Sequence, residues 1–210
     1  MKTSKKLRLC LPSGGLEEDW VSLYQASFPA EERVDPAVLR KDIADGKRLL
    51  HRTLDSAGSL LCFSLTFVGL EEFVWLSYIA TDPLQQSRGI GTMHMKELLS
   101  MLAARYSDRQ GLLFEIESTN VEHANNRRLQ FYLRLNAKRM PQGVSYLMPS
   151  FVDGGEPIAA ELLWIEFGHS TVELRTVQSA IAEVYEKIYH LGPNNKVVQT
   201  VLSQFAPCSV

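Results

Sequence analysis

Two glycines, Gly89 and Gly91, lie in the stretch TDPLQQSRGIGTMHM, where a strand-like sequence changes into a helical one. The helix is predicted to begin near Ile90, so the free amides of its first turn point toward the loop. Such amides bind phosphate groups, and glycine lets the ligand approach the backbone. The alternative is a flexible loop that needs unusual dihedral angles. No GK[ST] follows the glycines, and His94 stands where a dinucleotide-binding GxGxxG motif needs its third glycine.

The elements that must hold this loop alternate between strands and helices. From apolar periodicity, strands are predicted at residues 6–11, 49–54, 59–68, 73–80, 111–118, 137–148 and 160–167. Helices are predicted at residues 16–28, 35–46, 90–102, 125–135, 174–191 and 196–205. The turn sequence DSAG predicts an antiparallel hairpin between residues 49–54 and 59–68. Hairpins combined with helical crossovers predict an α/β protein, with a mixed sheet and helices on both faces.

Composition limits the possible functions. The chain has 210 residues, 45% of them hydrophobic, and a net charge of -2, which gives no overall field for nucleic acid. The three cysteines have neither disulfide nor zinc-site spacing, and the five histidines show no ligand spacing, so no metal is expected. The basic start MKTSKKLR is not followed by a signal-peptide apolar run, and no stretch of about 18 apolar residues exists. We therefore expect a cytoplasmic protein that binds neither nucleic acid nor membrane.

The longer pattern around the glycines resembles the acyl-CoA motif of the GNAT acetyltransferase superfamily. Thr81, Pro83, Gln86, Gly89 and Gly91 follow a strand and open an apolar helix, as in the motif Q/R-x-x-G-x-G/A. The resemblance implies a fold with a central mixed, mostly antiparallel sheet flanked by helices, and acetyl-CoA as co-substrate. It also implies a pantetheine contact at Ile79 and Thr81, and pyrophosphate contacts at Gln86, Arg88, Gly89, Ile90, Gly91 and Thr92.

A second block, NNRRLQFYLRLNA, resembles the family helix N-x-x-A-x-x-[FL]-Y-x-x-x-G-[FA]. Asn125 falls on its Asn, as a further cofactor contact, and Tyr132 on its Tyr. Arg128 and Asn136 replace the alanine and the glycine, and Asn tolerates the left-handed conformation that follows a helix. Together the two blocks and the element order cover roughly residues 6–167.

Acetyl transfer to an amine needs an oxyanion donor, an acid for the departing thiolate and a base. The resemblance implies a backbone N–H of Ile79 or Tyr78 as the donor and Tyr132 as the acid. Trp75 stands where some family members have a glutamate base. Glu115, on one strand face with Glu117, is the better-centred candidate; both carboxylates could instead be solvated or paired with Arg127 and Arg128, and a water chain could replace the base.

Two loops are candidates for the acceptor pocket. FPAEERVDP, residues 28–36, concentrates Glu31, Glu32 and Arg33, and resembles an FPxxER loop in a subset of bacterial family members. Adjacent carboxylates suit a cationic amine; the alternative is a charged surface loop. YLMPSFVDGGEP, residues 146–157, is long for a connection and could bring Tyr146 and Phe151 to the pocket.

The C-terminal part has an apolar seam on one predicted helix, from Leu174 to Leu191, with Ser170 or Thr171 as cap and Gly192 as its stop. The second helix repeats the pattern from Val197 to Phe205. These helices either dock on their own domain or make a homodimer. We therefore predict an acyltransferase domain at residues 1–168 and a helical extension at residues 169–210.

The resemblance predicts an N-acetyltransferase that transfers acetyl from acetyl-CoA to a primary amine of a small molecule or peptide, by direct attack in a ternary complex. The alternative is a non-catalytic acyl-CoA sensor whose C-terminal helices signal to a partner. Tyr132 favours the enzyme, whereas Trp75 and Arg128 leave the alternative open.

Overall fold

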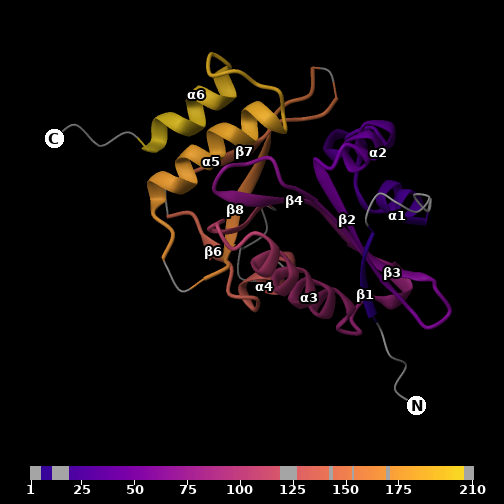
Figure 1. The fold of residues 1–210 in the computed structure, drawn as a ribbon. Helices are drawn as coiled ribbons and strands as arrows, with labels where there is room; N and C mark the ends of the chain where they lie inside the picture. Colours follow the sequence, from indigo (N-terminus) through magenta and orange to yellow (C-terminus); the bar gives the residue numbers. More distant parts are fainter. Residues whose placement is uncertain are drawn as a thin grey trace. The chain divides into compact units, whose positions relative to one another are not determined.

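The computed structural model describes residues 6–10, 19–118, 127–141, 144–152, 154–168 and 171–205, and of residues 6–10 it describes the backbone (Figure 1). The chain forms two compact units. The first comprises residues 1–68 and 75–105, and the second comprises residues 69–74 and 106–210. Each unit is built around its own antiparallel strands.

The first unit has an antiparallel strand series flanked by helices. Its strands, in order, are β1 (Lys6–Cys10), β2 (Arg48–Leu54), β3 (Leu60–Phe67) and the part of β4 (Phe73–Thr81) from Trp75 onward. Its helices are α1 (Asp19–Ser27), α2 (Pro36–Ala44) and α3 (Ile90–Arg105), with short 3-10 turns η1 (Ala30–Glu32) and η2 (Pro83–Gln85).

Local sequence signals in this unit are confirmed. Asp35 caps α2 by accepting a hydrogen bond from the Ala37 amide at 2.7 Å, and Gly46 follows the helix with φ +72°. The hairpin between β2 and β3 forms at DSAG, where the Asp55 side chain accepts from two amides and Gly58 has φ +90°. The first residues of the predicted helix 16–28 lie outside the described part, and α1 continues from Asp19.

Alternation along the strands assigns the two faces of this unit. Phe63 and Leu65 on β3 pack with Trp20 and Tyr24 of α1 and with Leu39 of α2. The intervening side chains of β3 face α3, since Cys62 contacts Ile90 and Ser64 bonds to His94. Helices α1 and α2 therefore cover one face and α3 covers the other (Figure 1).

A buried polar layer joins α3 to the strands. The His94 Nδ1 lies 2.8 Å from the Thr53 hydroxyl of β2, and its Nε2 lies 2.7 Å from the Ser64 hydroxyl of β3. His51 lies beside this pair, with its Nε2 3.1 Å from the Thr66 hydroxyl. Burial lowers the pKa of His94 to about 4 and that of His51 to about 3, so both rings are neutral at pH 7.

The second unit is organised around one long strand. β8 (Ile158–Glu166) pairs antiparallel with β5 (Gly111–Glu117), β6 (Lys138–Arg139) and β7 (Tyr146–Met148). The helices are α4 (Arg127–Leu133), α5 (Leu174–Lys187) and α6 (Lys196–Leu202), followed by the 3-10 turn η4 (Ser203–Phe205). No helix in the described residues has the length and apolar character needed to cross a bilayer.

The structure corrects some predicted boundaries in the second unit. The single strand expected at residues 137–148 is divided into β6 and β7, because Pro141 between them has no N–H to donate to a ladder. Helix α5 ends at Lys187 rather than at residue 191, and Glu173, not Ser170 or Thr171, occupies its N-cap position without a side-chain hydrogen bond to the helix amides. Ser170 lies outside the described residues.

Most of the apolar seam of the C-terminal helices is buried within the chain, although Leu174 at its start is exposed. Val177, Ile181 and Val184 are buried in α5, and Val198 and Val201 are buried in α6. In α6 the predicted Val201 is buried, whereas Val198 is buried in place of the predicted Val197, which is half-buried.

Acid should weaken the first unit through His94. In the unfolded chain its pKa is near 6.5 and in the folded protein near 4, so the unfolded state binds more protons as pH falls below 6.5. His94 should therefore contribute a loss of about 2 kcal/mol in unfolding free energy between pH 7 and pH 5. Urea unfolding of His94→Gln should show a flatter pH dependence than wild type, whereas exposed His190→Asn should not. Parallel curves for His94→Gln and wild type would contradict this assignment.

Candidate functional site

The predicted glycine loop lies between β4 and α3 with an unusual backbone. After β4 ends at Thr81, Asp82 caps the 3-10 turn by accepting from the Leu84 amide at 2.9 Å. Ser87 and Gly89 then adopt left-handed conformations, with φ +59° and +76°. The left-handed conformation is uncommon for a non-glycine residue such as Ser87. Together, Ser87 and Gly89 turn the chain into α3, which begins at Ile90.

The loop presents its backbone to solvent while its neighbours anchor inward. Ile90 is 2% exposed and packs with Cys62 and Leu61, and Ile79 of β4 lies against the same cluster. Gly89 is exposed, and a Cβ added to it would meet nothing within 4 Å. The first-turn amides of α3 thus start at an open surface, which is the arrangement that binds an anion.

The side chains that were predicted to contact the cofactor lie around this turn. The Gln86 side chain donates to the Thr81 carbonyl at 3.4 Å, and the Arg88 guanidinium donates to Gln85 at 3.2 Å. Both Gln86 and Arg88 are exposed, and Gly91 and Thr92 are half-buried in the first turn of α3. Thr81 donates to the Cys62 thiol at 3.4 Å. Burial raises the pKa of Cys62 to about 12, so this thiol is not a nucleophile at neutral pH.

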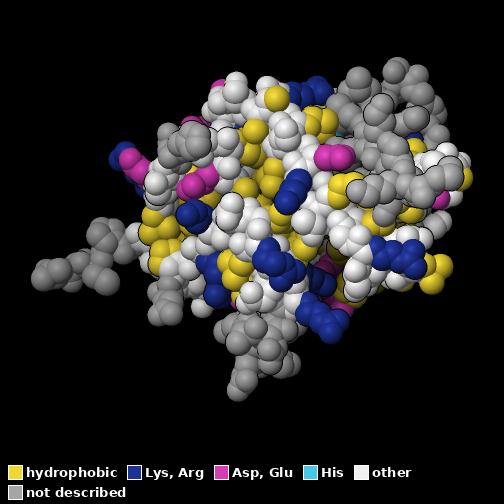
Figure 2. All heavy atoms as spheres, turned by 90° about the horizontal axis from the view of Figure 1, so that it is seen from below, with side chains coloured by type: hydrophobic (Ala, Val, Ile, Leu, Met, Phe, Trp, Pro, Cys, Tyr) yellow, Lys and Arg dark blue, Asp and Glu magenta, His cyan; other side chains and the backbone are white. Residues whose placement is uncertain are grey.

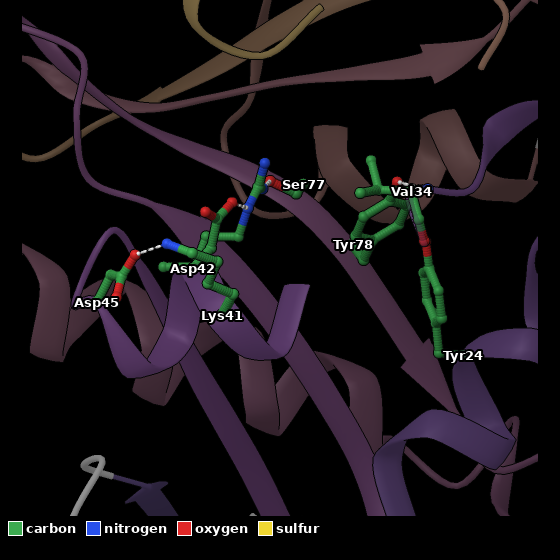
Figure 3. A network of polar contacts seen from close by, with 8 residues as sticks. Tyr24, Val34, Lys41, Asp42, Asp45, Ser77 and Tyr78 are labelled. Atoms are coloured by element: carbon green, nitrogen blue, oxygen red, sulfur yellow. Dashed lines mark hydrogen bonds and ion pairs between the residues drawn. The ribbon is translucent and has the colours of Figure 1, made fainter. Parts of the chain in front are cut away.

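Strand β4 has a bulge close to the glycine loop. Leu76 and Tyr78 pair with the adjacent residues Thr66 and Leu65, so Ser77 is the extra residue. The buried Arg48 guanidinium donates to the Ser77 hydroxyl at 2.5 Å and to Asp42 of α2 at 3.0 Å (Figure 3). A bulge leaves backbone groups without a partner in the strand-to-strand hydrogen bonds. The Arg48 guanidinium fixes this bulge by its bond to Ser77.

Tyr78 binds the FPAEER loop to β4. Its hydroxyl donates to the Glu32 carbonyl at 3.0 Å. The same hydroxyl accepts from the Val34 amide at 3.2 Å, and Tyr24 donates to the Val34 carbonyl at 2.9 Å (Figure 3). The Phe28 ring packs edge-on against Tyr78 at a centroid distance of 5.0 Å. The loop is therefore held by aromatic residues along residues 28–34, and it contains the 3-10 turn η1 rather than irregular chain alone.

The charged residues of this loop have different surroundings. Arg33 donates to the Gln25 carbonyl of α1 at 3.1 Å, and Glu31 is exposed. Glu32 contributes its backbone carbonyl to Tyr78. Trp75, at the position of the glutamate base in the resemblance, is 2% exposed in the core and offers no proton acceptor.

The second unit places the two predicted catalytic residues on opposite faces of β5. Tyr132 of α4 packs on the Phe114 ring at a centroid distance of 4.4 Å. Glu115, the next residue along β5, accepts a hydrogen bond from the Tyr189 hydroxyl beyond α5. Adjacent strand residues point to opposite faces, so α4 and the end of α5 meet β5 from opposite sides.

The predicted cap of α4 is confirmed. Asn136 has φ +64°, its amide donates to the Leu133 carbonyl at 3.0 Å, and the Ala137 amide donates to the Tyr132 carbonyl at 3.1 Å. This pair of bonds is a Schellman motif, which fixes the helix end that carries Tyr132. Asn125 lies outside the described residues, so its predicted cofactor contact stays a prediction.

Basic side chains are concentrated after β5. Arg127, Arg128, Arg134 and Lys138 are exposed on α4 and beyond it, and Arg139 pairs with Glu161 at 2.6 Å. Figure 2 shows one face of the molecule on which Lys and Arg side chains cover more area than Asp and Glu. With a net charge of -2 overall, such basic areas are local features that suit a small anion.

No family model matches the sequence, and no curated protein matches it. Solved structures do match. A protein described as a GNAT-family acetyltransferase from Bacteroides thetaiotaomicron superposes with a TM-score of 0.70 at 20% identity, covering 89% of this chain and 99% of its own. The chain has the GNAT fold. The predicted fold class, α/β with a mixed sheet flanked by helices, is thereby confirmed.

Two further solved structures match at lower similarity. Arabidopsis thaliana NAA60 in complex with acetyl-CoA has a TM-score of 0.58 at 12% identity, covering 78% of this chain and 98% of its own. The ribosomal-protein-S18-alanine N-acetyltransferase from Escherichia coli has a TM-score of 0.54 at 15% identity, covering 81% and 99%. At these identities the likeness establishes the fold.

Several residues at these sites were not found by sequence reasoning. Ser87 and Arg48 had no signal, since left-handed serine and a buried arginine both depend on the folded surroundings. Tyr189 lies 74 positions after its partner Glu115, and periodicity does not link such positions. Among the described residues, no group of His, Cys, Asp and Glu side chains is arranged to hold a metal.

The glycine loop makes a testable prediction for acetyl-CoA binding. Gly89→Ala and Gly58→Ala carry the same left-handed strain in open surroundings, at a cost of about 1 kcal/mol each. Calorimetric titration should show acetyl-CoA affinity about tenfold weaker for Gly89→Ala and unchanged for Gly58→Ala, because only the first adds a methyl group beside the amides. Gly91→Glu should abolish binding. Wild-type affinity in both loop variants would place the cofactor site elsewhere.

Proposed function

We propose that the protein is an N-acetyltransferase, which transfers the acetyl group of acetyl-CoA to a primary amine by direct attack in a ternary complex. One observation carries the proposal. The GNAT fold here has an exposed turn, with Ser87 and Gly89 left-handed, that opens the amide end of α3 directly after β4. That turn has the shape and the dipole for a pyrophosphate.

The residues around the turn fit the cofactor. The amides from Gly89 to Thr92 receive the pyrophosphate, and the exposed Arg88 and Gln86 add contacts from the same loop. Ile79 and Thr81 at the end of β4 offer backbone groups to the pantetheine arm. By the family resemblance, Asn125 is a further proposed cofactor contact. Binding of acetyl-CoA by NAA60 supports this cofactor choice through the shared fold.

The transfer step requires a neutral amine. Its nitrogen attacks the thioester carbonyl, a carbon–nitrogen bond forms, and the carbon–sulfur bond then breaks. The oxyanion formed between these events is stabilised by a backbone N–H near the β4 bulge, at Tyr78 or Ile79. Arg48 fixes that bulge by its bond to Ser77. Tyr132 gives its hydroxyl proton to the departing thiolate, while the amine's proton passes to a base.

Glu115 is the proposed base, and each unit has its own candidate groups for recognising the acceptor. In the second unit, Tyr146 lies near Glu115, whose charge contributes to raising the pKa of that tyrosine. In the first unit, Glu31, Glu32 and Arg33 belong to the loop that Tyr78 holds. Protein amines are acceptors of the ribosomal-protein-S18-alanine N-acetyltransferase, which supports a peptide or small-molecule amine here.

The proposed function is tested by titrating the protein with acetyl-CoA, with free CoA and a longer acyl-CoA alongside. Micromolar binding of acetyl-CoA followed by amine-dependent thiol release supports the enzyme. Binding without turnover on any amine would favour the acyl-CoA sensor, for which the buried Trp75 at the usual base position is the supporting observation. No binding at millimolar concentration would overturn both functions.

Tyr132→Phe tests the role of the acid. The ring should stay packed on Phe114, whereas the hydroxyl proton is lost. We expect kcat to fall by about 10²- to 10³-fold with acetyl-CoA affinity within about twofold of wild type. Tyr106→Phe in the same unit is the matched control and should keep full turnover. Equal kcat for Tyr132→Phe and wild type would remove Tyr132 from the mechanism, and thermal unfolding would show whether the fold is intact.

A further inference from the structure

Arg48, at the start of β2, carries a charge into the interior of the first unit. Its side chain is 5% exposed, and its guanidinium donates to the Asp42 carboxylate of α2 at 3.0 Å and to the Ser77 hydroxyl of β4 at 2.5 Å (Figure 3). The guanidinium also lies over the ring of Phe67, its cross-strand neighbour on β3, at 5.3 Å from the centroid. One side chain therefore reaches from β2 over β3 to β4.

Packing alone does not account for a charge at this position. Burial of a guanidinium costs desolvation free energy, and an apolar side chain of similar size fills such a place without that cost. The cost is offset here by two directed bonds, from Nε to Asp42 and from Nη1 to Ser77. Because the guanidinium is planar and rigid, the bond at Nε also fixes the direction of Nη1. Asp42 of α2 thereby orients Arg48 toward Ser77.

The bond to Ser77 acts on the bulge of β4. In a regular strand the adjacent residues Ser77 and Tyr78 would point to opposite faces. In this strand Ser77 turns toward Arg48 and Asp42 of α2, while Tyr78 packs in the core with residues of α1 and α2. The extra residue of the bulge lets both side chains lie on one face. A bond that holds Ser77 there stabilises the bulged backbone over a regular strand.

The chain segment 28–44 is attached to both residues of this bulge. The Tyr78 hydroxyl bonds to the backbone of the FPAEER loop. Helix α2, which follows that loop, reaches Ser77 through Asp42 and Arg48. Two consecutive residues of β4 are therefore held from one continuous stretch of chain. Their backbone is the part of β4 whose N–H groups the proposed transfer uses.

We infer that Arg48 is a positioning residue for acetyl transfer: by holding Ser77, it sets the direction of the backbone N–H at Tyr78 or Ile79 that stabilises the oxyanion. The inference rests on the proposed function and adds a residue that acts through the backbone, not on a reacting atom. A donor that is oriented in advance stabilises the transition state because no reorganisation is needed during the reaction. A misplacement of about 1 Å at such a group lowers the rate by about 10²-fold.

Arg48→Met tests this role, with Arg52→Met as the matched control. Arg52 lies on the same strand and face, its side chain is 8% exposed, and it pairs with Asp19 of α1 at 3.0 Å. Each change removes a buried ion pair between β2 and a helix, so both should lower the melting temperature. Only Arg48→Met should lower kcat, by about 10- to 100-fold, with the KM for acetyl-CoA within about twofold of wild type. Equal changes of kcat in the two variants would overturn the inference.

Two variants at Ser77 leave the ion pair of Arg48 with Asp42 in place. Ser77→Ala removes only the hydroxyl that Arg48 holds, and it should lower kcat by about tenfold. Ser77→Thr keeps a hydroxyl at the same position and should stay within about threefold of wild type. The inference is wrong if Ser77→Ala has the kcat of wild type, or if the two variants lose kcat equally.

The carbonyl of bound acetyl-CoA reports on the donor directly. A hydrogen bond polarises the thioester carbonyl and moves its carbon-13 resonance downfield. With acetyl-CoA labelled at this carbon, the bound resonance should move downfield in wild type and in Arg52→Met. In Arg48→Met it should return toward the value of free acetyl-CoA. A downfield shift that Arg48→Met retains in full would contradict the inference.

The two proposals fail in distinguishable ways. Turnover by wild type with an unchanged kcat in Arg48→Met would leave the enzyme and overturn the role of Arg48. If wild type transfers acetyl to no amine, the proposed function is overturned, and amide hydrogen exchange at Tyr78 and Ile79 then tests the bulge alone. These amides should exchange faster in Arg48→Met than in Arg52→Met. Equal exchange rates would overturn Arg48 as the residue that holds the bulge.

Discussion

The glycine loop can bind an anion only if the start of α3 is held in place, and a buried imidazole provides that constraint. His94 bonds to Thr53 and Ser64 on two neighbouring strands, one turn after the loop. A rigid attachment matters because amides oriented before binding lose little entropy when the ligand arrives. It also explains the missing third glycine of a dinucleotide motif: in this protein the position attaches the helix to the sheet.

Within each unit, neighbouring residues of one strand point to opposite faces and contact different elements. On β4, Ile79 and Thr81 point to the α3 face, while Tyr78 points to the opposite face and holds the loop at residues 28–34. On β5, Phe114 meets Tyr132, and Glu115 meets Tyr189 on the other face. Two reactants that approach a strand from opposite faces can meet at its backbone without competing for space. This pattern suits direct transfer from one reactant to the other.

The features that could be predicted from the sequence are those that depend on interactions between residues close together in the chain. The cap at Asp35, the turn at DSAG and the left-handed Asn136 each depend on a few adjacent residues, and the structure confirms them. The division of residues 137–148 into β6 and β7 and the early end of α5 were missed, since strand pairing partners and helix packing decide them. The aromatic surroundings of Glu115 likewise bring together segments that no local pattern connects.

The location of the carboxylate follows from the same physical limits. A glutamate at position 75 would be buried in the core that Trp75 fills. Burial of an unpaired charge there would lower the free energy of unfolding by roughly several kcal/mol. Glu115 instead lies on a half-buried strand face, where the Tyr189 hydroxyl donates a hydrogen bond to its carboxylate. Filling the β4 position with tryptophan completes the core, and under the proposed function the base then lies on β5, where Tyr189 of the C-terminal segment contacts it.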